Sequence, residues 1–289
     1  MKLHAIIVTY FPRIDHLERL ACALQVSHVQ VIVVDNTPGP GASPIAGCRH
    51  VPMGDNLGIA AAQNRGVELA MADGADVVLF FDQDSTISAG FVERLVARLD
   101  ITRPGVVGPV FHDEAQGFEC PCYVLNPWGY PNKMLSMDRT EPYDVDVRIS
   151  SGSAVTAATF PVVGPMDESL FLDYVDVEWC LRARARGVPI RIDPAATMKH
   201  SIGEAAVQVG PLKVFIDGPT RTYYRVRNAL LLLRKREVPV VFALKEITSE
   251  IVHHTIQLVI AKQRVARLGA TLSGLWHGLA GIGGRRAPP

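Results

Sequence analysis

The sequence contains neither of the glycine-rich loops that most often hold a nucleotide phosphate. No G-x-G-x-x-G follows the first predicted strand, and G-x-x-x-x-G-K-[ST] occurs nowhere in the chain. Any bound nucleotide must therefore be held by another arrangement. The chain also contains no run of 18 or more apolar residues, so we expect no helix that spans a membrane.

Cysteine is scarce, and its placement argues against a disulfide scaffold and a zinc site. The five cysteines, at positions 22, 48, 120, 122 and 180, are few and scattered, and a reduced, cytosolic setting fits them better. Cys120 and Cys122 have no second pair at zinc-ligand spacing, so we interpret them as ordinary thiols. The N-terminus, MKLHAIIVTYFPR, has one lysine and a short apolar run, which indicates a first strand rather than a signal peptide.

Of the 289 residues, 48% are hydrophobic and 20% are charged, which indicates a sizeable core and argues against global disorder. The formal net charge is zero, but the two ends of the chain differ. Residues 1–220 hold 17 Lys and Arg against 26 Asp and Glu, a balance of −9, whereas residues 221–289 hold 12 against 3, a balance of +9. This asymmetry suggests a basic tail that faces something anionic.

Strand and helix patterns alternate through the first hundred residues. Apolar runs predict strands at 3–9, 29–36 and 75–84, and helical spacing predicts helices at 13–24, 58–74 and 89–100. Such alternation is typical of an α/β fold with a mostly parallel, doubly wound sheet and helices on both faces. Ligands of such sheets bind beyond the carboxyl ends of the strands.

Polar residues follow all three predicted strands. They are Thr9 and Tyr10 after the first, Asp35 and Asn36 after the second, and Asp82, Gln83 and Asp84 after the third. Any one of these could be a turn or a helix cap, because Asp and Asn are favoured there. Their occurrence at three equivalent strand ends favours a shared site along one edge of the sheet.

The stretch VVLFFDQDS, residues 77–85, carries a buried strand directly into two carboxylates. Asp82 and Asp84 leave the strand end two positions apart, so they can converge on one hard cation and on a ribose. Mg²⁺ and Mn²⁺ prefer carboxylate, water and phosphate oxygens, and either ion would let an acidic region bind an anionic diphosphate. We therefore expect Mg²⁺ or Mn²⁺ as the cofactor.

Five motifs follow one another along the chain: VTYFP (8–12), VVDN (33–36), NLGIAAAQNRG (56–66), FFDQDS (80–85) and FLDYVDVEWCLRARARG (171–187). In these motifs and their order the chain resembles the inverting family 2 glycosyltransferases with the GT-A fold, and most of all the bacterial rhamnosyltransferases of O-antigen assembly and rhamnolipid synthesis. The resemblance covers residues 4 to 236. We expect a GT-A catalytic domain over residues 1–220, followed by a basic, amphipathic helical region over residues 221–289.

The resemblance implies a reaction and its partners. The donor would be dTDP-L-rhamnose, and the acceptor would be a saccharide or a lipid-linked molecule in the synthesis of a cell-surface polysaccharide or glycolipid. No nucleic-acid partner is expected. The location would be cytoplasmic, with the cytoplasmic face of the inner membrane as the narrower alternative.

For the donor, the resemblance implies contacts at the strand ends and in the motif at 56–66. Thr9 and Tyr10 would line the nucleotide pocket, and Asp35 would accept a hydrogen bond from the imide N–H of the base. Asp82 would contact the ribose, and Asp84 would hold the metal. The other donor contacts would be Asn36, Asn56, Gly58, Ala61 and Asn64. Gln83 departs from the many relatives that carry a third acid or a small residue there.

The motif at 171–187 implies the general base. Asp173 and Asp176 are three residues apart on one helix face, and in the family an acid at the position of Asp176 deprotonates the acceptor hydroxyl. We take Asp176 as the base and Asp173 as the second choice. Glu178 and Arg182 fit a different interpretation, a salt-bridged surface helix that begins near Asp173.

Contacts with the sugar and the acceptor are expected at Ser151 and Gly152, in the loop ISSGSAV (149–155), and at Trp179. The loop also fits a purely structural turn. His200, at a predicted strand end, would complete the metal site, with a structural histidine as the alternative. Arg227, in RTYYRVRNALLLLRKRE (221–237), would bind a phosphate, with an exposed basic helix face as the alternative.

Two other functions stay open at this point. The same fold could use another nucleotide sugar, such as a UDP-hexose, because no residue in the sequence identifies the hexose. The chain could also be a nucleotide-binding, membrane-associated scaffold without turnover. The paired acids and Asp176 argue against the scaffold, which needs neither.

Residues 238–282 combine apolar residues with Lys245, Lys262, Arg264 and Arg267. The segment is too interrupted to span a bilayer. It could form helices that lie on a membrane, with basic residues towards anionic headgroups. Alternatively, these helices pack on the catalytic domain or form a homo-oligomer contact.

Overall fold

The computed structural model describes residues 1–289 except 114–116, 138, 201–205, 210–211, 261 and 287–289, and it describes no side chains within 200–215. The strands are β1 (Leu3–Thr9), β2 (Gln30–Asp35), β3 (Arg49–Pro52), β4 (Val77–Asp82), β5 (Thr86–Ile87), β6 (Val106–Asp113), β7 (Phe118–Glu119), β8 (Cys122–Leu125), β9 (Pro131–Met134), β10 (Tyr143–Asp144), β11 (Ala154–Thr156), β12 (Ile190–His200), β13 (Ala206–Val209) and β14 (Leu212–Phe215). The helices are α1 (Ile14–Val26), α2 (Ile59–Ala72), α3 (Phe91–Val96), α4 (Thr159–Val163), α5 (Val175–Ala185), α6 (Pro219–Leu232), α7 (Val240–Ile260) and α8 (Arg264–Ala280).

The main sheet has the strand order β10-β12-β6-β11-β4-β1-β2-β3. β1 pairs in parallel with β2 and β4, β2 with β3, and β6 with β12. β11 differs, because it lies antiparallel between β4 and β6. The long central strands are thus mostly parallel, and the predicted α/β fold class is confirmed.

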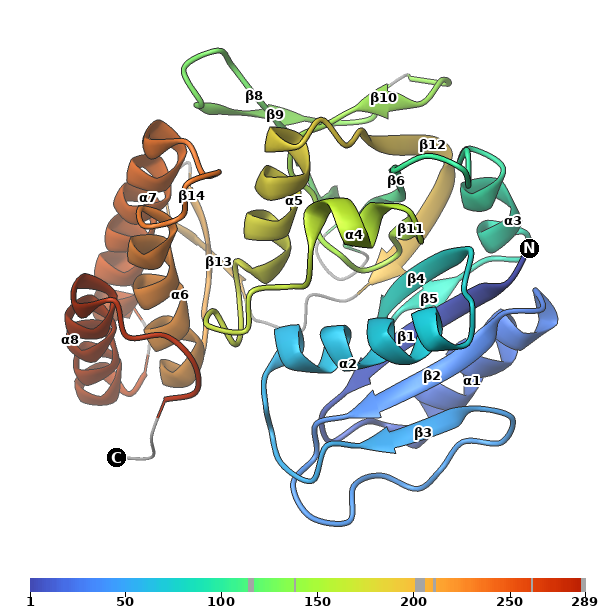
Figure 1. Ribbon diagram of the computed structural model, residues 1–289. Helices are drawn as coiled ribbons and strands as arrows, with labels where there is room; N and C mark the ends of the chain where they lie inside the picture. The colour runs from blue at the N-terminus through green and yellow to red at the C-terminus, as the bar shows by residue number, and fades with distance from the viewer. Residues whose placement is uncertain (114–116, 138, 201–205, 210–211, 261, 287–289) are drawn as a thin grey trace.

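Helices cover both faces of the sheet (Figure 1). Residues of α2, α4 and α5 pack on one face with Val78 and Phe80 of β4, and residues of α1 and α3 pack on the other face with Leu79 and Phe81. Successive side chains of a strand point to opposite faces. Because both faces are buried, β4 is apolar at every position from 77 to 81.

The last three helices lie side by side (Figure 1). Small residues of α8 allow its close approach to α6. Ala270, Gly274 and Gly278 are buried at four-residue intervals along α8. An added Cβ at Gly274 would lie 2.8 Å from the carbonyl oxygen of Tyr223 in α6, so a larger residue would push the helices apart. The boundary expected at residue 220 falls inside α6, and the division into a catalytic domain and a C-terminal helical region stays a prediction.

Several local expectations differ from the structure. The helix expected to begin near Asp173 begins at Val175, because residues 173 and 174 have left-handed backbones. The predicted ion pair of Glu178 and Arg182 forms at 2.7 Å, but Glu178 is only 3% exposed, so α5 is not a surface helix. The five cysteines are free thiols. Among the helices of the described residues, none combines the length and the apolar character needed to cross a membrane.

Candidate active site

The carboxyl ends of β1, β2 and β4 meet at one edge of the sheet. In the parallel register, Thr9 lies opposite Asp35, and Val8 lies opposite Asp82. Thr9 and Asp35 are joined directly, since the Thr9 hydroxyl donates a hydrogen bond to Oδ1 of Asp35 at 3.0 Å. The polar residues that follow these three strands therefore share one edge, as expected.

Asp35 is completely buried and orders the loop that follows β2. Besides Thr9, the backbone N–H groups of Thr37 and Ala42 donate to its carboxylate, at 2.9 and 2.5 Å. Burial alone would raise the pKa of Asp35, but these hydrogen bonds outweigh it and hold the pKa below its usual value. Asp35 is thus ionised and engaged within the protein, and its hydrogen bond to a base stays a prediction.

Gln83 fastens the end of β4 to the end of β1. Its side-chain oxygen accepts a hydrogen bond from the Tyr10 N–H at 2.7 Å, and its amide group donates to the Tyr10 carbonyl at 3.3 Å. A carboxylate in this place could accept but not donate. Gln83 therefore positions the strand end. Tyr10 is 47% exposed beside Phe11, which leaves an aromatic surface at this edge.

The chain enters α2 through Gly58, which has a φ of +91°. An added Cβ at Gly58 would lie 2.7 Å from the carbonyl oxygen of Phe171, so the position requires glycine. Asn36 donates to the Gly58 carbonyl at 2.9 Å, and the side chain of Asn56 accepts from the Gly58 N–H at 3.0 Å. These three predicted donor contacts form one hydrogen-bonded unit against Phe171.

Asn64 connects α2 to the segment that precedes α5. Its amide group donates to the Met166 carbonyl at 3.0 Å and to Glu168 at 2.9 Å, and its oxygen accepts from the Met166 N–H at 2.7 Å. Ala61, one turn earlier in α2, is partly exposed. Asn64 has structural partners on both ends of its amide, and nucleotide contacts at Ala61 and Asn64 stay predictions.

The loop before β11 lies directly beside Asp82. The Ser151 hydroxyl accepts a hydrogen bond from the Asp82 N–H at 3.1 Å, and the Gly152 N–H donates to the Phe80 carbonyl at 2.7 Å. Gly152 has a φ of +74°, and an added Cβ would lie 2.8 Å from the side chain of Pro109. The loop is therefore a structural turn that holds Ser151 against the end of β4, and contacts of Ser151 and Gly152 with the sugar or the acceptor stay predictions.

Asp176 lies in the first turn of α5 and is partly buried. Burial is the largest reason that the pKa of Asp176 is raised, to about 6. The negative charges of Asp173 and Asp82 raise this pKa further, while hydrogen bonds with the backbone at Val177 and Ser150 lower it. The negative charge of Asp82, at the end of β4, therefore acts on the carboxyl group of Asp176. A group with this pKa exchanges a proton readily near neutral pH.

Asp173, the other acid of this segment, is bound by Arg221 of α6. Nε of Arg221 lies 3.0 and 3.1 Å from the two carboxylate oxygens of Asp173, and Nη2 lies 2.9 Å from Oδ1. Such charge-assisted pairing occupies the lone pairs of a carboxylate. Among the described residues, no arginine forms a comparable ion pair or hydrogen bond with Asp176. Asp173 and Asp176 thus have different electrostatic environments and are suited to different chemical roles.

Tyr174 joins the start of α5 to α7. It has a left-handed φ of +62°, and its hydroxyl lies 3.0 Å from Glu246 and 2.9 Å from Glu250. Glu250 is also bound by Arg225 of α6, at 2.7 Å. No role was predicted for Arg221, Arg225 or Glu250. The four-residue spacing of the two arginines, which places them on one face of α6, is the signal that could have indicated a shared function.

Trp179 and Arg227 are both in the interior. Trp179 is 4% exposed, and its Nε1 donates to the Gly164 carbonyl at 3.0 Å. Arg227 is 0% exposed, and its guanidinium donates to the carbonyls of Ser169 and Leu170, at 3.1 and 2.8 Å. The alternative of an exposed basic helix face at Arg227 is therefore wrong. Contacts of Trp179 with an acceptor and of Arg227 with a phosphate stay predictions, and both would need these side chains to become accessible.

The chemistry of the β4 end fits a divalent cation. Asp82 and Asp84 supply two carboxylates at a rigid strand end, and the charge of Asp82 already acts on Asp176. Magnesium is commonly bound through one or two carboxylates together with water and substrate phosphates. Among the described residues, no group of three or more His, Cys, Asp or Glu side chains converges on one point. The side chain of His200, the third predicted ligand, lies outside the described residues.

The chain is similar to known glycosyltransferases. A model of the family described as Glycosyl transferase family 2 matches residues 5–156. The chain is 36% identical over 287 residues, 98% of its length and 97% of the relative, to the dTDP-rhamnosyl transferase RfbF of Shigella flexneri. It is 28% identical over 235 residues, 68% of its length and 75% of the relative, to the N-acetylglucosaminyl-diphospho-decaprenol L-rhamnosyltransferase of Mycobacterium tuberculosis.

Solved structures share the fold at low identity. A structure of GalNAc-T7 with UDP, GalNAc and Mn²⁺ has a TM-score of 0.59 at 12% identity, and a structure of S. aureus TarS 1-349 has 0.56 at 14%. Each match covers 98% of this chain, which spans 56% of the first structure and 83% of the second. These similarities concern the fold alone.

Replacing Asp176 with Asn should stabilise the protein above neutral pH. The pKa of Asp176 is raised from its usual 3.8 to about 6, so ionisation opposes folding. This destabilisation is absent below about pH 4, grows as the pH rises towards 6 and is complete above it. Asp176→Asn should therefore raise the free energy of unfolding by about 1–3 kcal/mol at pH 8 and leave it nearly unchanged at pH 4. Urea unfolding at the two pH values measures both quantities.

Asp167→Asn is the control of opposite sign. Burial would raise the pKa of Asp167, but its hydrogen bonds with Lys235 and Ser169 outweigh burial and lower the pKa. The stabilisation from Asp167 is therefore present above its usual pKa and is lost as the pH falls, so Asp167→Asn should destabilise the protein at pH 8. An Asp176→Asn protein that is less stable than the wild type at pH 8 would contradict the raised pKa.

Proposed function

The chain belongs to glycosyl transferase family 2, and from this membership we propose that it transfers L-rhamnose from dTDP-L-rhamnose to an acceptor hydroxyl, with inversion at the anomeric carbon. The nearly full-length similarity to a dTDP-rhamnosyl transferase supports the donor. The placement of Asp176 carries the mechanism: its carboxyl group lies in the first turn of α5 within the field of Asp82 at the end of β4, and its pKa is raised to about 6. The product would enter a cell-surface polysaccharide or glycolipid.

Inversion requires a single in-line displacement, and Asp176 is its general base. The Asp176 carboxylate takes the proton of the acceptor hydroxyl while the hydroxyl oxygen forms a bond to the anomeric carbon. The bond from that carbon to the diphosphate oxygen breaks, and the nucleotide diphosphate leaves with the electron pair. A base with a pKa of about 6 is mostly ionised at neutral pH and still basic enough to accept a proton.

The strand ends hold the donor. Asp84 is the principal ligand of a divalent cation, Mg²⁺ or Mn²⁺, and Asp82 lies beside the ribose. When bound, the cation offsets the negative charge that develops on the leaving diphosphate. The half-exposed ring of Tyr10 offers a surface on which the base can stack. Asp35 orders the loop around this surface, since its carboxylate holds Thr37 and Ala42.

The acceptor is a lipid-linked saccharide, and the protein meets it at the cytoplasmic face of a membrane. A relative named for a diphospho-decaprenol acceptor supports this class of acceptor. The helices α7 and α8 also expose apolar side chains at helical spacing. On α8 they are Val265, Leu268, Leu272, Trp276 and Leu279. Exposed Lys262 and Arg264 lie beside this stripe and suit anionic headgroups.

Arg267 does not belong to this basic surface, although it was predicted there. It is 5% exposed, and its guanidinium donates to the Gln257 side chain at 2.7 Å and to the Lys262 carbonyl at 3.1 Å. Of the four basic residues predicted there, Lys245 is only partly exposed and pairs with Glu246 at 2.7 Å, so Lys262 and Arg264 are the two exposed residues that suit a headgroup.

Vesicle binding tests the membrane contact. The protein should sediment with vesicles that contain anionic lipid at low salt and should be released at high salt, because exposed charges are screened. Lys262→Gln/Arg264→Gln should weaken this binding, whereas Arg19→Gln/Arg65→Gln, with the same change of charge at exposed sites in α1 and α2, should not. Absence of binding at low salt, together with a dimer that is lost when α8 is truncated, would favour the homo-oligomer contact instead.

Asp176→Asn should lower kcat by about 10²–10⁴ with little change in donor affinity, because Asn keeps the shape of the side chain but cannot take a proton. Release of dTDP with a lipid-linked acceptor measures kcat, and calorimetric titration with dTDP measures donor binding. Asp173→Asn is the matched comparison and should be milder, because Asp173 is bound to Arg221. A larger loss of kcat in Asp173→Asn than in Asp176→Asn would assign the base to Asp173.

Chelation and Asp84→Asn test the metal assignment. EDTA should abolish turnover, and Mg²⁺ or Mn²⁺ should restore it in the wild type but not in Asp84→Asn. The fold of the variant should be intact, because Asp84 lies on the exposed side of the strand end. Undiminished turnover after thorough chelation would indicate a site that works without a metal.

A further inference from the structure

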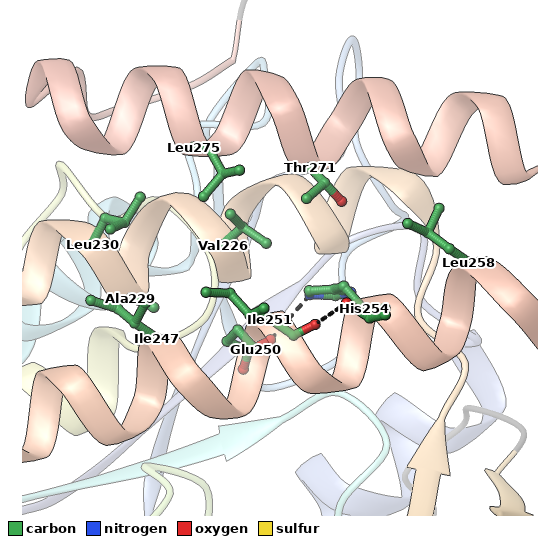
Figure 2. Close-up of a pocket in the computed structure, with 11 residues that line it drawn as sticks. Val226, Ala229, Leu230, Ile247, Glu250, Ile251, His254, Leu258, Thr271 and Leu275 are labelled. Carbon is green, nitrogen blue, oxygen red and sulfur yellow. Dashed lines mark hydrogen bonds and ion pairs between the residues drawn. The ribbon is translucent and has the colours of Figure 1, made fainter.

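A pocket of about 210 Å³ lies among the three C-terminal helices, apart from the β4 acids (Figure 2). Its apolar walls come from Val226 and Leu230 of α6, Ile247 and Leu258 of α7, and Leu275 of α8. Figure 2 shows these side chains on the facing sides of the three helices. The mechanism above gives this pocket no role.

Most polar side-chain atoms of the pocket lining have hydrogen-bond partners within the protein, whereas the buried Nε2 of His254 forms no hydrogen bond. Thr255 and Thr271 each donate to the carbonyl four residues earlier in the same helix, at 2.7 and 3.0 Å. Glu250 is bound by Arg225, and His254 lies 3.1 Å from Glu250. Helix backbones satisfy their own N–H groups. Because most of the described lining is apolar and most of its polar groups are engaged, the pocket favours an apolar ligand such as a hydrocarbon chain.

The pocket opens on the apolar surface of α7 and α8. Ile251 lines the pocket although it is 54% exposed, and Thr255 lines it from an exposed position. Leu272, on the neighbouring turn of α8, is 57% exposed. A hydrocarbon chain can thus run from this surface into the pocket, while Lys262 and Arg264 lie on the same two-helix unit and complement an anionic headgroup.

One wall of the pocket is hydrogen-bonded to Tyr174, the residue that precedes α5 and its proposed base. Glu250 accepts a hydrogen bond from the Tyr174 hydroxyl at 2.9 Å, and Tyr174 immediately precedes α5, whose first turn contains Asp176. An acceptor whose reacting hydroxyl lies at Asp176 and whose hydrocarbon chain lies along α7 would extend from the proposed base to the pocket. A lipid-linked saccharide has both parts.

We propose that the pocket between α6, α7 and α8 binds a segment of the hydrocarbon chain of the lipid-linked acceptor. This rests on the proposed function for the identity of the lipid. The size fits, because an apolar cavity of about 150 Å³ is known to hold benzene, so this pocket holds a short stretch of an isoprenyl chain. The rest of the chain would lie along the exposed stripes of α7 and α8.

A chain-length series tests the proposal without turnover. Isopentenyl, geranyl and farnesyl diphosphate share one headgroup, and their binding to the full-length protein is measured by calorimetry in EDTA, so that no metal holds the diphosphate at the β4 acids. Farnesyl diphosphate should bind at least about tenfold more tightly than isopentenyl diphosphate, because each buried methylene adds to affinity. Thr255→Phe and Thr271→Phe, which fill the pocket from two helices, should abolish this dependence on chain length.

Thr248→Phe is the matched control. Thr248 lies two turns before Thr255 on α7, is likewise exposed and donates to its own helix at 2.8 Å, but it does not line the pocket. This variant should keep the chain-length dependence, and Thr255→Val, which keeps the side-chain volume, should keep it too. Thermal unfolding and dTDP binding should match the wild type in all four variants.

The possible outcomes distinguish a failure of the pocket proposal from a failure of the proposed function. Chain-length-independent binding by a wild-type protein that binds dTDP would overturn the pocket proposal and leave the donor assignment intact. Binding that depends on chain length, by a protein that does not bind dTDP, would support the pocket proposal and overturn the donor assignment. A concentration-dependent dimer that Thr255→Phe dissociates, with no chain-length dependence, would overturn the proposal in favour of a second copy of the chain as the occupant.

Discussion

The residues of α6 and α7 hold residues 171–174 in a backbone conformation that this segment would not adopt alone. Phe171, Asp173 and Tyr174 all have φ near +60°, in the left-handed region that is unfavourable for residues other than glycine. Each such residue costs about 1–3 kcal/mol and persists only when its surroundings fix it. Asn228 donates to the Asp173 carbonyl at 3.0 Å, Arg221 binds the Asp173 carboxylate, and the Tyr174 hydroxyl reaches α7. The start of α5, and with it Asp176, therefore depends on helices that follow the family-matched residues in the sequence.

The proposed donor side of the site is fixed by the sheet. Gln83 ties β4 to the backbone of Tyr10, and Ser151 accepts the N–H of Asp82. The close approach of Gly58 to Phe171 then connects this side to the 171–174 segment. Two rigid structures, one built on strand ends and one on C-terminal helices, thus meet across the site. This arrangement suits chemistry in which a base and a leaving group must face each other across one carbon.

Local pattern was sufficient to predict β1, β2 and β4, the edge of the sheet where they end, and the acids at that edge. These features depend on alternating hydrophobicity and on the parallel register, both of which are local or follow from connection rules. Long-range contacts were not predictable in this way. Arg227 looks like a basic helix residue, but its partners are carbonyls 57 and 58 residues earlier. The pKa of Asp176 depends on burial and on Asp82, which is far away in the sequence. Only the fold brings these groups together.

The central claim is a single displacement in which Asp176 activates the acceptor hydroxyl. The most direct test is the stereochemistry of the product, determined by NMR after the wild-type protein has reacted dTDP-L-rhamnose with a lipid-linked acceptor. A single displacement predicts a rhamnoside whose anomeric configuration is opposite to that of the donor. Retention of the donor configuration would contradict the account, because a single in-line displacement inverts the anomeric carbon.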